Sequence, residues 1–108
     1  MVKKTRSRAK TKEQAEKLLA KMPEEYIFRS QDGRIFKDMK ELAEGLAAMS
    51  DDTFAYHANL ERNDFSKWVK DIIDDDKLAS DLAMSTSRTE AAGYVAARLN
   101  FLTSKLVR

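Results

Sequence analysis

The chain has 108 residues, of which 43% are hydrophobic and 35% are charged, with three Gly and one Pro, a composition typical of one helix-rich domain rather than of a disordered chain. It contains no Cys and a single His, which excludes a disulfide framework and a zinc ribbon. The net charge of +2 conceals an asymmetry: residues 1–12 carry +6, residues 13–84 carry −7 and residues 85–108 carry +3. Two basic ends around an acidic middle favour a partner that is anionic.

The first residues have no apolar periodicity, and they predict a flexible basic arm over 1–11, followed by a single helical domain over 12–108. No apolar segment follows the basic residues, so a signal peptide is not predicted. No apolar run approaches the roughly 18 residues of a membrane span. We therefore expect a cytoplasmic protein without a membrane partner.

Polar residues that can cap the N–H groups of a first helical turn recur along the chain, each followed by apolar residues at helical spacing. The caps are Thr11, Asp38, Ser50, Asn63, the Asp74–Asp76 run and Ser87. The helices that they predict cover about residues 12–22, 39–49, 51–60, 64–73, 75–84 and 88–106.

Between the first two helices, Tyr26–Phe28 and Arg34–Phe36 flank Asp32-Gly33, which predicts a β-hairpin. Two strands alone are marginal in water, so the hairpin is expected to pack on the helices. Gly45 costs its helix about 1 kcal/mol relative to Ala, which suggests a close helix crossing. The predicted fold is mainly α, with five to six short helices packed around one small β-hairpin.

The stretch Tyr56–Val69 holds the only His and the only Trp of the chain. A catalytic His needs a nucleophile or a substrate to protonate and a group that orients it, and no Cys or Gly-flanked Ser lies nearby. His57 falls on an apolar helix face, with Glu61 four residues later as a reachable partner. We interpret His57 as structural, Asn63 as a cap and Trp68 as core, and an enzyme built on His57 is the weakest alternative.

The same region resembles a known family. The patterns are F-x-x-x-D-G-R-x-F-K-D at Phe28–Asp38, M-S-D-D-x-F-x-Y-H at Met49–His57, E-R-N-D-F-x-x-W-V at Glu61–Val69 and D-x-x-L-A at Asp75–Ala79. Together they resemble a small domain of unknown function found mainly in archaeal proteins, over about residues 25–84. The resemblance implies an archaeal source and a shared corner structure. It implies no activity, and any specialised function is expected outside the match, in the basic arm and the last helix.

The run Asp74-Asp75-Asp76 lacks the alternating ligands, the Gly and the final Glu of an EF-hand loop. Capping and solvation explain these carboxylates better than a cation site does. The chain also lacks the Gly-x-x-x-x-Gly-Lys frame of a phosphate loop. We predict no metal, no cofactor and no catalytic residue, and hence no enzyme.

The last helix carries two stripes. The first is an apolar seam, which packs on the domain's own core or, as the less favoured alternative, joins two copies in a homodimer; it comprises Val95, Leu99, Leu102 and Leu106. The second alternates aromatic and basic residues, which suits a phosphate backbone or, equally, the edge of a core covered by Arg stems; it comprises Tyr94, Arg98, Phe101, Lys105 and Arg108.

The leading hypothesis is a small non-enzymatic nucleic-acid-binding protein, nucleoid-associated or chromatin-like, that contacts phosphates of DNA in preference to RNA. The predicted contacts are Lys3, Lys4, Arg6, Arg8, Lys10, Lys12, Arg98, Lys105 and Arg108. The alternative is a protein-interaction or ribosome-associated adaptor whose acidic middle contacts a basic protein. A non-specific solubility tail also explains a run of bases like that in residues 1–12.

Overall fold

The structure is a computed structural model that describes residues 11–106. Within these residues, six α-helices and one antiparallel hairpin confirm the mainly α fold. Their bounds are α1 Lys12–Leu19, β1 Phe28–Arg29, β2 Ile35–Phe36, α2 Met39–Ala48, α3 Asp51–His57, α4 Asp64–Trp68, α5 Asp76–Ala83 and α6 Arg88–Ser104. A 3-10 turn at Glu24–Tyr26 precedes the hairpin, and a π-helical turn at Val69–Ile73 extends α4. Across this described part of the chain, no helix has both the length and the apolar character that crossing a membrane would need.

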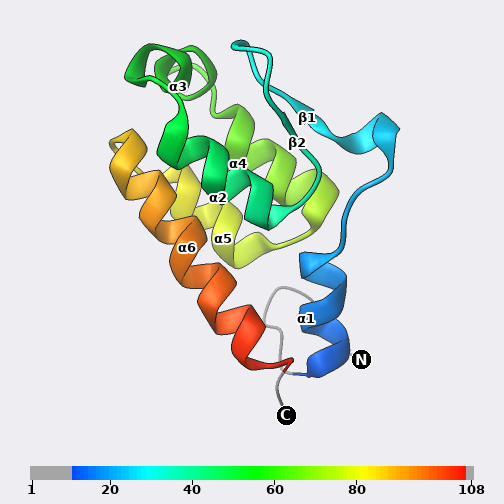
Figure 1. The fold of residues 1–108 in the computed structure, drawn as a ribbon. Helices are drawn as coiled ribbons and strands as arrows, with labels where there is room; N and C mark the ends of the chain where they lie inside the picture. Colours follow the sequence, from blue (N-terminus) through cyan, green and yellow to red (C-terminus); the bar gives the residue numbers. More distant parts are fainter. Residues whose placement is uncertain (1–10, 107–108) are drawn as a thin grey trace.

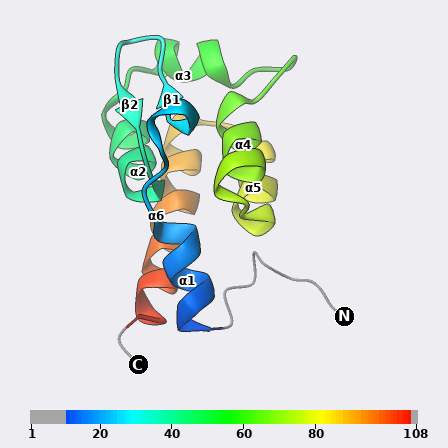
Figure 2. The ribbon, with the colours of Figure 1, turned by 90° about the vertical axis from the view of Figure 1, so that its right-hand side faces the viewer.

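The longest helix, α6, runs along most of the molecule and packs against α1, α2 and α5 (Figure 1). Figure 2 shows that α1 lies beside the last turns of α6 at one end of the molecule, whereas α3 and the tip of the hairpin lie at the other. We call these the α1 end and the α3 end. The molecule measures 40 × 24 × 24 Å, so the two ends are well separated.

Each α-helix begins where a capping side chain was expected. The side-chain oxygen of the cap accepts a hydrogen bond from a backbone N–H of the first turn in all six helices, which satisfies a donor that the helix itself leaves unpaired. The caps are Thr11, Asp38, Ser50, Asn63, Asp75 and Ser87. The predicted helix starts are therefore confirmed.

The helix ends differ more from expectation. The first helix stops at Leu19 rather than near residue 22, because Met22 instead donates its N–H to the carbonyl of Lys37, 2.7 Å away. The third stops at His57 rather than near residue 60, because the side-chain amide of Asn59 donates to the carbonyls of Ala55 and Tyr56.

The hairpin is shorter than the sequence runs suggested. Phe28 pairs with Phe36 and Arg29 with Ile35, and Gly33 takes the left-handed backbone conformation, with φ of 95°, that the tight turn requires. Tyr26 belongs to the 3-10 turn instead of a strand. The ring of Phe28 contacts those of Phe36, Phe65 and Trp68, which packs the hairpin on α4.

Gly45 does mark a close approach, although not a helix crossing. A Cβ at this position of α2 would overlap the ring of Phe36, so β2 rests directly on the helix backbone. The hairpin, α2 and α4 thereby share one core with α6. The fully buried side chains of that core include Leu42, Leu46, Phe65, Val69, Leu78, Val95 and Leu102.

Candidate functional site

The corner around His57 is held by hydrogen bonds on both ring nitrogens. Nδ1 lies 2.9 Å from a carboxylate oxygen of Asp64, and Nε2 accepts the backbone N–H of Gln31 at 2.9 Å. The side chain is 5% exposed and lies against the rings of Phe28 and Phe65. Because Nε2 accepts a hydrogen bond, the ring is neutral with its proton on Nδ1. His57 therefore ties the hairpin tip to the start of α4.

The expected partner of His57, Glu61, was the wrong residue. Since α3 ends at His57, Glu61 does not occupy the next helical turn and its carboxylate is not brought back to the ring. Asp64, in the first turn of α4, takes that place. Trp68 is core, as expected, and its indole N–H donates to the carbonyl of Tyr26 at 2.7 Å.

A buried ion pair joins α5 to α6. Asp75 is 0% exposed and receives two hydrogen bonds from the Arg98 guanidinium, at 2.8 and 3.1 Å, while it also caps α5 through Leu78 N–H. The expectation that the Asp74–Asp76 run serves capping is confirmed by Asp75. The expectation of solvation is wrong for Asp75, because its side chain is buried. A charged carboxylate is stable at this depth only because a cation and hydrogen bonds surround it.

The same ion pair bears on the predicted role of Arg98 as a phosphate contact. Its side chain is 9% exposed and its guanidinium is committed to Asp75, so it contributes to the fold rather than to a free basic surface. A signal for this was present in the sequence. The buried residues of α6 are spaced 4, 3, 4, and Arg98 shares that register with Ala91, Val95 and Leu102.

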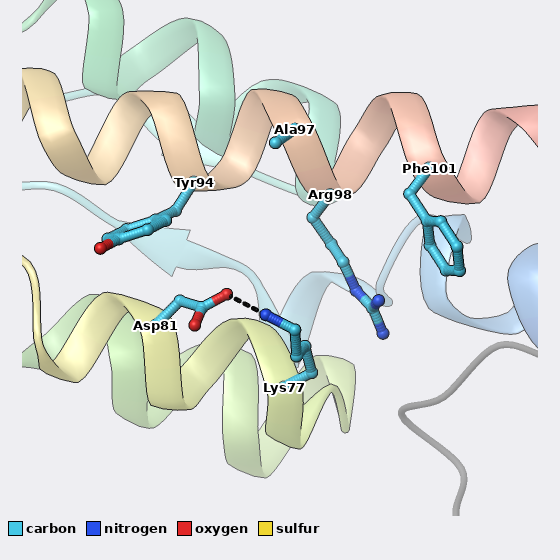
Figure 3. A pocket seen from close by; sticks show the side chains of 6 residues that line it. All are labelled: Lys77, Asp81, Tyr94, Ala97, Arg98 and Phe101. Atoms are coloured by element: carbon cyan, nitrogen blue, oxygen red, sulfur yellow. Dashed lines mark hydrogen bonds and ion pairs between the residues drawn. The ribbon is translucent and has the colours of Figure 1, made fainter.

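A groove of about 400 Å³ lies between α5 and α6, next to the buried pair (Figure 3). One wall carries Lys77 and Asp81 of α5, whose side chains form an ion pair of 2.7 Å. The other wall is α6, which contributes Tyr94, Ala97, Arg98 and Phe101. Three members of the predicted alternating stripe, Tyr94, Arg98 and Phe101, therefore line one hollow.

Phe101 separates two cations. The Arg98 guanidinium lies 5.3 Å from the centre of its ring and the Lys105 ammonium 4.9 Å from it. Within residues 11–106, Lys105 forms no ion pair with a carboxylate. Its charge is therefore fixed in place by a cation–π contact and not neutralised.

The remaining predicted contacts divide into two groups. Lys3, Lys4, Arg6, Arg8, Lys10 and Arg108 lie outside the described residues. Lys12 begins α1 and Lys105 follows α6, and both belong to the α1 end (Figures 1 and 2). The chain thus enters α1 and leaves α6 at the same end of the molecule.

The apolar seam of α6 faces inward. Val95 and Leu102 are 0% exposed, and Leu99 and Leu106 are partly buried against the same core. Packing on the chain's own core accounts for these residues, as the favoured alternative expected. A homodimer stays a prediction and would need a different surface.

No family model matches this chain, and neither the curated proteins nor the solved structures contain a match. The resemblance to an archaeal domain therefore stays a prediction. Among residues 11–106 no group of three or more His, Asp or Glu side chains is placed to hold a metal ion.

Proposed function

We propose that this chain is a small non-enzymatic nucleic-acid-binding protein that contacts phosphates through residues 1–12 and 105–108, with DNA as the preferred polymer. Such a protein would act in the nucleoid of the cell, as a nucleoid-associated or chromatin-like protein. Binding is electrostatic: each phosphate contact releases condensed counterions, which supplies affinity without base recognition.

The observation that carries the proposal is the shared end of α1 and α6. Lys12 and Lys105 lie at this end, and the sequence segments 1–12 and 105–108 that adjoin them hold eight basic residues, namely Lys3, Lys4, Arg6, Arg8, Lys10, Lys12, Lys105 and Arg108. Because the chain enters α1 and leaves α6 at this end, one phosphate backbone can be reached from both segments. The acidic groups on α1, Glu13 and Glu16, offset only part of this charge.

Seven of the twelve Lys and Arg residues between residues 13 and 104 form an ion pair with a carboxylate. Lys21 bonds Asp38 and Glu41, and the hydrogen bond to Asp38 is the main cause that raises the pKa of Lys21. Further pairs join Arg34 to Asp32, Arg62 to Asp64, Lys67 to Asp71, Lys77 to Asp81 and Arg88 to Asp51. This pattern favours the α1 end as the surface that meets an anionic polymer.

The test compares the full chain with a variant that lacks residues 1–10 and keeps Thr11, so that the cap of α1 is intact. Fluorescence anisotropy with labelled duplex DNA and structured RNA near physiological salt measures binding. We expect the truncated chain to bind DNA at least about 10-fold more weakly, since several phosphate contacts are lost.

A control variant replaces Lys40 and Lys70 with Gln, which removes two positive charges where the truncation removes five. Both are exposed and neither forms an ion pair with a described residue, yet neither belongs to the basic segments. Their loss is expected to change affinity by less than about 3-fold, because removal of two distant charges perturbs only the long-range potential. The proposal is overturned if the control variant binds DNA as weakly as the truncated chain does, or if the full chain binds neither polymer.

One observation favours the second candidate, a protein-interaction adaptor. Leu60 is fully exposed in a turn that Asn59 fixes, since the Asn59 side-chain oxygen accepts the N–H groups of Glu61 and Arg62. Tyr56 is half exposed next to it and lies 5.1 Å from the Arg62 guanidinium. A fixed turn that presents Tyr56 and Arg62 beside an exposed Leu resembles the aromatic and Arg anchors of protein interfaces.

The adaptor is tested with Leu60→Ser, which removes no buried contact. Crosslinking at position 60 first identifies a basic protein partner. The variant is then expected to bind that partner more weakly, while its affinity for DNA stays unchanged. An unchanged affinity for that partner removes this candidate.

A further inference from the structure

A groove lies between α5 and α6, outside the basic segments 1–12 and 105–108. It is a hollow of about 400 Å³, the size of sites that hold small ligands, and it lies between two helices (Figure 3). Tyr94 points from α6 toward the side of α5, and Ala97, three residues later, contributes a small side chain to the lining. The lining thus combines an aromatic ring with a small side chain.

The electrostatics of the groove favour a ligand with both a polar edge and a negative charge. The Lys77–Asp81 pair presents a donor and an acceptor side by side on the α5 wall. Lys105, beyond Phe101, holds a cation that no described carboxylate neutralises. A short single strand offers the matching groups, because its bases have donors and acceptors on their edges and its phosphates carry the charge.

The shape of the groove favours single-stranded over duplex nucleic acid. A base enters a hollow between two helices only when it is unpaired and free to leave the stack. Aromatic side chains beside a basic path are the usual means by which proteins hold single strands without reading their sequence. Phe101 is less suited to stacking than Tyr94, because Arg98 and Lys105 lie close to its ring.

We propose that the α5–α6 groove binds one unpaired base of a single-stranded nucleic acid, with the base stacked on Tyr94 and a phosphate further along the strand at Lys105, which lies about 16 Å away along α6. This inference rests on the proposed function, since the phosphates of the strand continue to the basic segments at the α1 end. It extends that function by making single strands, DNA or RNA, the preferred form of the polymer.

The test measures the affinity of the full chain for a single-stranded DNA, a single-stranded RNA of the same sequence and the corresponding duplex DNA. We expect a single-strand preference that Tyr94→Leu reduces by about 5- to 100-fold, the range of one lost stacking contact. Tyr94→Phe keeps the ring and is expected to keep the preference. Tyr56→Leu, the matched replacement of an exposed Tyr at the α3 end, is expected to leave it unchanged.

A second measurement does not depend on the folding of any variant. Single strands that contain 5-iodouracil are crosslinked to the unmodified protein by light, and the modified peptide is identified by mass spectrometry. We expect the crosslink on Tyr94 or Phe101. A crosslink confined to Tyr26 or Tyr56 overturns the groove as the site.

The outcomes separate this inference from the function on which it rests. Equal affinity for single strands and duplex, with no effect of Tyr94→Leu, overturns the groove and leaves phosphate binding at the α1 end intact. No binding to any of the three polymers overturns both.

Discussion

Asp75 and Arg98 form a buried ion pair that joins the N-cap of α5 to the middle of α6, with contacts of 2.8 and 3.1 Å. The pair lies directly behind the groove, whose wall includes Arg98. It fixes the distance between the two helices on which the single-strand proposal depends. Its integrity is therefore a condition of both the fold and the candidate site.

Arg98→Met is expected to lower the free energy of unfolding by about 3–5 kcal/mol, because it leaves the Asp75 carboxylate buried without its cation. Urea denaturation measures the change. The matched control is Lys67→Met, which breaks an exposed pair with Asp71 and should cost no more than about 1 kcal/mol. Equal effects of the two replacements would contradict the burial of the Asp75–Arg98 pair.

His57→Phe preserves the ring among Phe28 and Phe65 but removes both hydrogen bonds of the imidazole. We expect a loss of about 1–3 kcal/mol in stability, since Gln31 N–H and Asp64 each lose a partner. Amide hydrogen exchange at Gln31 should accelerate, while exchange in the middle of α6 should change only through the global loss. Unaltered protection at Gln31 would show that His57 does not hold the hairpin tip.

Gly45→Ala and Gly93→Ala form a matched pair within helices. At Gly45 the new methyl group overlaps the ring of Phe36, which should cost about 1–3 kcal/mol. At Gly93 it meets no atom within 4 Å, so the higher helix propensity of Ala should stabilise α6 by about 0.5–1 kcal/mol. Thermal unfolding of both variants measures the contrast, and two changes of the same sign would contradict the close packing of β2 on α2.

The turn of the hairpin should respond to acid through Asp32. Partial burial raises the pKa of this carboxyl, but the hydrogen bond from Arg34 N–H and the Arg34 guanidinium together hold it below the ordinary value of 3.8. Stability from this contact is present above that ordinary value and is lost as the pH falls through the lowered one. NMR titration of the Arg34 amide should follow a midpoint below 3.8, and Asp32→Asn should abolish it.

Local signals predicted the helix starts well. Thr11, Asp38, Ser50 and Ser87 cap by reaching three residues along their own chain, so the sequence contains everything that the contact needs. The Asp32-Gly33 turn is local in the same way. The apolar spacing that follows each cap also indicates which face enters the core.

Contacts between distant residues were not predictable from such patterns. Asp75 and Arg98 are 23 residues apart, and the sequence does not show which of three consecutive carboxylates turns inward. Asp74 adopts a left-handed conformation, with φ of 72°, after the π-helical turn Val69–Ile73, and this break aims Asp75 at α6. The regular apolar spacing through Ile73 indicated an uninterrupted α-helix instead.

The salt dependence of DNA binding by the full chain tests the central claim most directly. If about six of the basic residues in segments 1–12 and 105–108 contact phosphates, the logarithm of the binding constant should fall with the logarithm of salt concentration at a slope of about −5 on duplex DNA. Removal of residues 1–10 should bring the slope close to −1 or −2. A slope that truncation leaves unchanged, or the absence of binding at low salt, would contradict a nucleic-acid-binding role for the α1 end.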